Sequence, residues 1–141
     1  MNIRPKVIIS VFNNHEVLLK VDHDSKSNYT TFIPVGGGVD FGETLVIAAL
    51  RELEEEIQIK NVPLKYLGFH EYIFKTNNVD RHELMFHYAC PISNIIRKNI
   101  PSMGVDNGQS FKIKWFTKEE VKSIKHSLVP PNIYSELQEH L

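Results

Sequence analysis

One stretch, residues 36–59, constrains the fold more than any other part of the chain. It opens with three consecutive glycines, Gly36–Gly38, and then runs from Thr44 to Ile57 without a Gly or Pro. Consecutive glycines are poor residues for the interior of a strand or helix, so they predict a loop whose backbone approaches another group closely. The uninterrupted segment after Thr44 predicts a helix.

The predicted helix has a core-facing stripe. At about 100° per residue, apolar side chains spaced three and four apart share one face. The side chains that we expect on this face are Val46, Leu50, Leu53 and Ile57.

A second face of the same helix carries Glu52, Glu55 and Glu56, while Glu54 points away from them. Like charges at these spacings repel by about 0.2–0.5 kcal/mol per exposed pair, and the C-terminal end of a helix disfavours anions. A bound hard cation would relieve both penalties, and ligands made only of oxygen suit Mg²⁺, Mn²⁺ or Ca²⁺. The alternative is a solvated acidic face, which the fixed spacing from the glycines disfavours.

The stretch resembles the signature of the Nudix hydrolases: Gly, five residues, Glu, seven residues, then Arg-Glu-apolar-any-Glu-Glu-any-Gly-apolar. The matching residues are Gly37, Glu43, Arg51, Glu52, Leu53, Glu55, Glu56 and Ile59. Gln58 stands where the family has its last Gly, which suits a left-handed helix end. We therefore expect either a negative φ at Gln58 or a Gln58→Gly variant that is more stable.

The resemblance implies a role for each matching residue. Glu52, Glu55 and Glu56 would hold Mg²⁺, or alternatively Mn²⁺, together with the carbonyl oxygen of Gly37. The backbone of Gly36–Gly38 would contact the substrate. Arg51 would hold Glu43 and so fix the loop against the helix, unless the two form only a surface ion pair of little energetic value.

Two residues are candidates for the general base. Glu83 begins a nearly continuous apolar run and could point over the helix end, or it could be a charge at the edge of a strand that faces water. Glu56 could act as the base or as a metal ligand. The predicted catalytic residues are therefore Glu52, Glu55, Glu56 and Glu83.

The rest of the chain predicts an α/β fold, with a mixed β-sheet that carries helices on both faces. The resemblance implies the Nudix-type α/β/α sandwich, and the length predicts one domain over residues 1–141. The predicted strands are 7–12, 16–21, 29–35, 64–74 with a bulge at Gly68, 83–92 and 111–115. The other predicted elements are a polar loop at 22–28, a long specificity loop at 93–110, a short helix from a capping box at Thr117, and a terminal helix at 133–140.

Charge and cysteine content exclude several classes of protein. The formal net charge of −1 gives no general attraction to nucleic acid or to an anionic membrane. The single cysteine, Cys90, excludes an internal disulfide and fits a reducing compartment, so we expect a cytoplasmic protein. No apolar run approaches the roughly 18 residues of a membrane span, and the N-terminal residues do not resemble a signal peptide.

Two function classes fit these observations. The first is a hydrolase that cleaves a diphosphate bond in a nucleoside diphosphate linked to another moiety, or in a nucleoside triphosphate. In that enzyme a metal-activated water would attack phosphorus. The second is a non-catalytic Nudix module that binds a nucleotide. The intact carboxylate trio favours the enzyme, and the near-neutral charge argues against a third idea, an RNA 5′-end hydrolase. The expected partner is a nucleotide-type small molecule, and the sequence allows a homodimer.

Overall fold

The structure is a computed structural model that describes residues 2–141. Its centre is an eight-stranded mixed sheet of order β5-β6-β1-β2-β8-β7, with β3 paired to β2 and β4 paired to β1. The strands are β1 (Ile3–Asn13), β2 (Glu16–Asp24), β3 (Tyr29–Ile33), β4 (Val35–Gly38), β5 (Lys65–Thr76), β6 (Val79–Pro91), β7 (Met103–Asp106) and β8 (Gln109–Thr117). The helices are α1 (Leu45–Ile57), α2 (Asn94–Asn99), α3 (Lys118–Ser123) and α4 (Tyr134–His140), with 3-10 turns η1 (Lys125–Ser127) and η2 (Pro131–Ile133).

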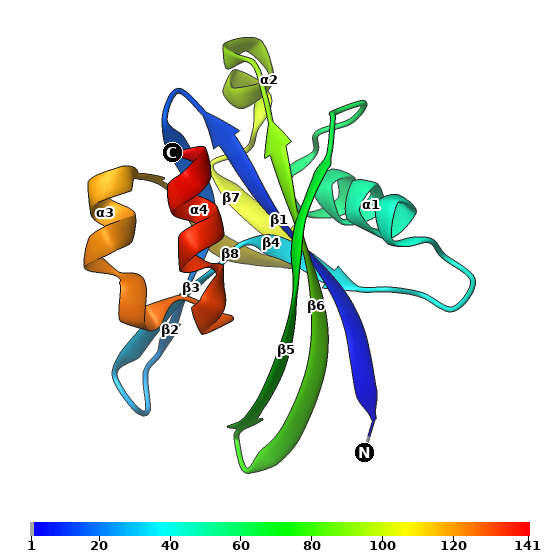
Figure 1. Cartoon of the computed structure of the whole chain (residues 1–141), viewed down its shortest axis with the longest axis vertical. Coiled ribbons are helices and arrows are strands. Elements are labelled where there is room, and N and C mark those ends of the chain that lie inside the picture. The colour runs from blue at the N-terminus through cyan, green and yellow to red at the C-terminus, as the bar shows by residue number, and fades with distance from the viewer. Residues whose placement is uncertain (1) are drawn as a thin grey trace.

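Helices cover both faces of the sheet, which confirms the predicted α/β/α arrangement. In Figure 1, α1 lies on one side of the sheet, and α3 and α4 lie on the other. Each side has its own apolar core. Leu53 of α1 packs in a cluster with Val7 and Ile9, whereas Leu137 of α4 belongs to a cluster that contains Ile8. Successive residues of β1 thus face opposite cores, so nearly all of its central part is apolar.

Strand β1 organises the sheet around the glycine stretch. It runs parallel to β6 on one side. On its other side, Val11–Asn13 pair with β2 and Lys6–Ile9 pair with β4. The glycines of β4 are therefore held in the middle of the sheet, beside α1.

The prediction that Gly36–Gly38 form a loop is wrong, because all three belong to β4. The predicted close approach is nevertheless present. Gly36 has a φ of +153°, and a Cβ there would lie 2.0 Å from the carbonyl oxygen of Val7. A Cβ on Gly37 would lie 2.5 Å from Oε1 of Glu52. The glycines are required because a neighbouring strand and a helix side chain press against this short strand.

Helix α1 lies where it is predicted, but a different set of its side chains faces the core. The side chain of Thr44 caps it by accepting a hydrogen bond from the backbone N–H of Ile47 at 3.2 Å. Leu53 and Ile57 are fully buried, but Val46 is 46% exposed, so its predicted core position is wrong. Ala48 and Ala49 are buried in its place.

The end of α1 decides between the two expectations for Gln58. Its φ of 60° and ψ of 38° are left-handed, so the expectation of a negative φ is wrong. The backbone N–H of Gln58 still closes the last turn by donating to the carbonyl oxygen of Glu54 at 3.1 Å. The helix therefore ends in the left-handed conformation that the family's glycine suits, although this chain has a glutamine at that position.

The predicted long loop at 93–110 is also wrong, because it contains α2 and β7. The side chain of Ser93 caps α2. Asn107 and Gly108, with φ values of 49° and 79°, form the tight turn between β7 and β8, as an Asn-Gly pair in a hairpin favours. The predicted loop at 22–28 is shorter than expected because β2 continues to Asp24.

The predicted strand 29–35 is divided, because β3 ends at Ile33 and β4 begins at Val35. Several other predicted elements are present in the structure. They include the first hairpin, the irregularity next to Gly68 in β5, the capping box between Thr117 and Glu120 at the start of α3, and the terminal helix α4.

Candidate active site

A cavity of about 440 Å³ lies where the C-terminal half of α1 faces β4. The predicted carboxylates Glu52, Glu55 and Glu56 line it, and so do all three glycines of β4. The lining also includes three basic residues from β1 and β2, the last residue of β7 and the first residue of the turn after it: Arg4, Lys6, Lys20, Asp106 and Asn107. The cavity therefore brings acidic and basic side chains together around one space.

The three carboxylates differ in exposure. Glu52 and Glu56 are 8% and 4% exposed, whereas the side chain of Glu55 is 57% exposed. Burial raises the pKa of Glu56 to about 7, although its Oε1 accepts a hydrogen bond from the backbone N–H of Gly36 at 2.9 Å. Burial also raises the pKa of Glu52, against the opposing effect of Arg51. Two ionisable groups are thus held in a place that penalises their charge.

Arg51 links the carboxylates to the loop before α1. Its guanidinium binds both oxygens of Glu43, the pairing that the family resemblance implies. This hydrogen bonding lowers the pKa of Glu43 to about 2. The remaining N–H groups of Arg51 reach Oε1 of Glu52 at 2.9 Å, Oε2 of Glu55 at 3.3 Å and the carbonyl oxygen of Gly38 at 3.0 Å.

The donor set of this cavity fits a hard divalent cation. Its carboxylates are oxygen donors, and the lack of a side chain at Gly37 lets the carboxylate of Glu52 lie against β4. Their oxygens are not drawn together around one point, since among residues 2–141 only His70, His87 and Glu136 place their ligand atoms within 4.8 Å of one another. Arg51 pairs with two of them, Glu52 and Glu55.

Glu83 lies in a neighbouring groove and does not line the cavity. It is 3% exposed, and its Oε2 is 3.1 Å from Nζ of Lys6. The alternative of a strand-edge charge facing water is therefore wrong, while its predicted catalytic role stays a prediction. Cys90 is fully buried, and burial raises its pKa to about 12.

The groove that holds Glu83 has a volume of about 490 Å³. It shares Arg4, Lys6 and Lys20 with the cavity, so the two adjoin. Tyr72 and Phe74, whose rings stack at 4.6 Å, also line this groove.

The sequence did not predict the cavity-lining residues that are brought there by the pairing of strands. Arg4, Lys6 and Lys20 are ordinary basic residues of β1 and β2, and no local pattern distinguishes them. Asp106 had one readable signal, the Asn-Gly turn that follows it, which predicts a hairpin. Only the tertiary structure shows that this hairpin lies beside α1.

Within residues 2–141, no helix is long and apolar enough to cross a membrane. Search of curated protein sequences finds no match to this chain.

Solved structures share the fold. A MutT NUDIX hydrolase from Burkholderia pseudomallei has a TM-score of 0.64 and 21% identity over 85% of this chain and 87% of that chain. A NUDIX hydrolase from Nitrosomonas europaea has a TM-score of 0.66 and 17% identity over 98% and 87%. The E. coli dihydroneopterin triphosphate pyrophosphohydrolase has a TM-score of 0.65 and 14% identity over 99% and 97%. At these identities the likeness concerns the fold.

The family itself follows from the sequence of the whole chain. The model of the NUDIX domain matches residues 2–137, which include all strands, α1 and most of α4. The predicted enzyme class is thereby confirmed. The chain belongs to the Nudix hydrolase family, whose enzymes act on phosphorus-containing anhydrides.

Proposed function

We propose that this protein is a Mg²⁺-dependent hydrolase that cleaves a diphosphate bond, with water attacking phosphorus. Its substrate would be a nucleoside diphosphate linked to another moiety, or a nucleoside triphosphate. The observation that carries the proposal is the composition of the cavity, in which Glu52, Glu55 and Glu56 line the same space as Arg4 and Lys20. The carboxylates suit a hard cation, and the basic side chains suit phosphate oxygens.

Each group of residues in the cavity would have its own role. Glu52, Glu55, Glu56 and the carbonyl oxygen of Gly37 would hold Mg²⁺, or alternatively Mn²⁺. The bound ion would neutralise diphosphate charge and activate a water molecule. Arg51 would keep the loop that contains Glu43 in place. The backbone of Gly36–Gly38 would face the substrate, because no side chains separate this part of β4 from the cavity.

Two carboxylates compete for the role of proton acceptor. Glu56 lines the cavity with the other ligands, which supports it as the acceptor. Glu83 is paired with Lys6, which itself lines the cavity. Under this proposal Glu56→Gln would remove the catalytic base, while Glu83→Gln would disturb the position of Lys6 and chiefly raise KM.

A nucleotide-type substrate is supported by the adjoining groove. Lys6 and Lys75 are paired with Glu83 and Asp80. The other basic residues of the groove, Arg4, Lys20 and Arg81, have no carboxylate partner within residues 2–141. Both of these arginines line the groove, beside the stacked rings of Tyr72 and Phe74. Phosphates would lie along the cationic part, and a base would stack at the aromatic end. The E. coli relative is named for a triphosphate of another aromatic ring system, dihydroneopterin.

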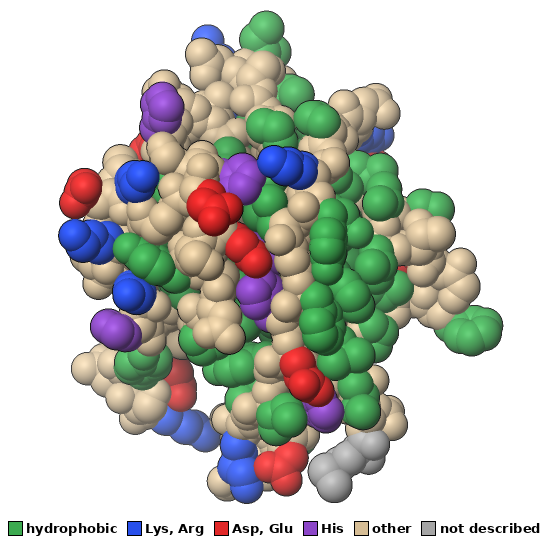
Figure 2. Space-filling view, viewed as in Figure 1, with side chains coloured by type: hydrophobic (Ala, Val, Ile, Leu, Met, Phe, Trp, Pro, Cys, Tyr) green, Lys and Arg blue, Asp and Glu red, His purple; other side chains and the backbone are tan. Residues whose placement is uncertain are grey.

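The partner, location and domain predictions are also proposals. Figure 2 shows hydrophobic side chains gathered beside β5 and β6 toward α1, a surface on which a second copy of the chain could pack. Tyr66, Phe69 and Ile73 of β5 are 52%, 49% and 67% exposed. Sedimentation measures whether the homodimer forms. We retain a cytoplasmic location and one domain over residues 1–141.

The test is a panel of nucleotides with Mg²⁺, scored for phosphate, pyrophosphate and nucleoside monophosphate, and run in ¹⁸O-labelled water. We expect the label in a phosphate-bearing product. Label found only in a sugar or base fragment would place the attack elsewhere. Tight nucleotide binding without turnover of any substrate would favour the alternative, a non-catalytic nucleotide-binding Nudix module.

A further inference from the structure

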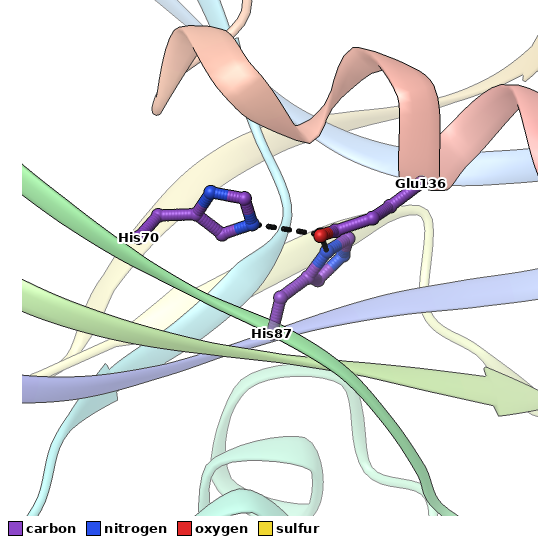
Figure 3. Close-up of side chains that lie close together, drawn as sticks. All are labelled: His70, His87 and Glu136. Carbon is purple, nitrogen blue, oxygen red and sulfur yellow. Dashed lines mark hydrogen bonds and ion pairs between the residues drawn. The ribbon is translucent and has the colours of Figure 1, made fainter.

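Three side chains from distant parts of the chain meet on the side of the sheet opposite α1. They are His70 of β5, His87 of β6 and Glu136 of α4, and Figure 3 shows both imidazole rings directed at one carboxylate oxygen. Oε1 of Glu136 is 2.8 Å from Nε2 of His70 and 2.7 Å from Nδ1 of His87. The three ligand atoms all lie within 4.8 Å of one another.

We propose that this cluster binds a transition-metal ion of the Zn²⁺ class, separately from the carboxylates of α1. Two imidazole nitrogens and one carboxylate oxygen are a donor set that Zn²⁺ favours. Mg²⁺, which prefers oxygen alone, would bind the other site. The two sites are thus distinguished by ligand chemistry as well as by the face of the sheet.

A buried hydroxyl group orients the ring of His87. Oγ of the fully buried Ser10 lies 2.7 Å from Nε2 of His87. With Nδ1 of His87 on the ion, Nε2–H would donate to Ser10 and fix the ring orientation.

The carboxylate of Glu136 fits beside β5, and the cluster is partly accessible to water. A Cβ on Gly68 would lie 2.4 Å from Oε2 of Glu136, so a glycine here admits the carboxylate. A tetrahedral Zn²⁺ with bonds of about 2.0–2.1 Å would place its ligand atoms about 3.3 Å apart. An ion would therefore move Oε1 of Glu136 slightly away from the two imidazole nitrogens, which lie 2.8 and 2.7 Å from it. The side chains of His70 and Glu136 are 11% and 19% exposed, so water can supply a further ligand.

A bound ion would join three elements that are distant in sequence. Glu136 lies 66 residues from His70 and 49 residues from His87 along the chain. The ion would therefore fasten α4 to β5 and β6, and its binding energy would stabilise the folded state.

The test uses the full chain, stripped with a chelator and then dialysed into excess Mg²⁺ so that the oxygen-only site is occupied. Co²⁺ is titrated as the probe, because nitrogen-ligated four-coordinate Co²⁺ absorbs visible light much more strongly than octahedral Co²⁺ on oxygen ligands. We expect one strongly absorbing ion per chain, displaced by Zn²⁺. At a Zn²⁺ concentration of 100 times Kd, the ratio of folded to unfolded protein should rise about a hundredfold.

Two variants and a matched control decide the assignment. His70→Gln and Glu136→Gln should weaken Co²⁺ binding by at least about tenfold, since each removes a ligand. His82→Gln is the control. His82 of β6 also pairs with a carboxylate, since its Nε2 is 2.7 Å from Oε2 of Glu71 in β5, but it does not belong to the cluster. Its Co²⁺ affinity should be unchanged.

Three results would overturn the proposal. The first is wild-type protein without the strong Co²⁺ absorption, and the second is equal affinity in wild type and His70→Gln. The third is a wild type whose stability does not respond to Zn²⁺ while His70→Gln is less stable without any metal. That result would show that the cluster acts through hydrogen bonds alone.

Discussion

Arg51 binds both carboxylate oxygens of Glu43, with Nε 2.7 Å from Oε2 and Nη2 2.9 Å from Oε1. This two-point contact joins α1 to the loop that follows β4. The same guanidinium also contacts Glu52 and the carbonyl oxygen of Gly38. A single side chain thereby fixes the distance between the glycine strand and the acidic face of the helix.

Arg51→Lys should destabilise the protein, because a lysine cannot form two parallel bonds to one carboxylate. The pKa of Glu43 is lowered from 4.5 to about 2 in the folded state. Its contribution is therefore present above about pH 4.5 and is lost as the pH falls toward 2. Denaturant unfolding at several pH values should show a difference between wild type and variant that shrinks on acidification. If the stability difference between wild type and variant does not depend on pH, the loss of stability does not come from the contact with Glu43.

Glu55→Gln and Glu56→Gln should each lower kcat by about 100-fold or more while the protein remains folded, if they hold the metal and activate water. Glu54→Gln is the matched control, because Glu54 leaves the same helix toward solvent and pairs with Lys60 at 3.3 Å. Its activity should match that of the wild type. Full turnover by both variants with EDTA present would rule out the proposed mechanism.

The stability of the metal-free protein should fall as the pH rises from about 4.5 to about 7. In the folded state the pKa of Glu56 is raised from 4.5 to about 7, so the folded state binds the proton more tightly than the unfolded state. A pKa shift of this size lowers the free energy of unfolding by up to about 3 kcal/mol once the carboxyl group is ionised. Glu56→Gln should remove this slope and be the more stable protein at pH 8, and Mg²⁺ should restore wild-type stability there. Unfolding curves with identical pH dependence in both proteins would contradict this assignment.

Gln58→Gly should raise the free energy of unfolding by about 1 kcal/mol, because the left-handed φ of 60° is strained for a residue with a Cβ. Gln58→Ala keeps the Cβ and should bring no such gain. Activity should be unchanged in both variants, since no proposed ligand is altered. Chemical denaturation measures the effect, and a less stable Gln58→Gly would mean that the glutamine side chain itself contributes.

Tyr72→Ala should raise KM for the preferred nucleotide by about 5-fold to 150-fold, which corresponds to the loss of about 1–3 kcal/mol of base stacking. Phe69→Ala is the comparison, because Phe69 is a half-exposed aromatic residue of the same strand that does not line the groove. The Mg²⁺ requirement should persist in both variants. Equal KM values would place the base outside this groove.

The sequence by itself determined the features that depend on local geometry. The extent of α1 and the grouping of Glu52 with Glu56 follow from helical spacing, which residues within a few positions of each other fix. The long fixed spacing from Gly37 to Ile59 also sufficed to identify the family, since no long-range contact is needed to read it.

Tertiary structure decided what depends on pairing between distant segments. Gly36–Gly38 form a strand because β1 offers them backbone partners, although their own conformational preference favours a loop. The same pairing brings Lys6 to the cavity, and the packing of β7 beside α1 brings Asp106 there. Strand partners and their register are set by burial across the whole sheet, so no window of sequence contains them.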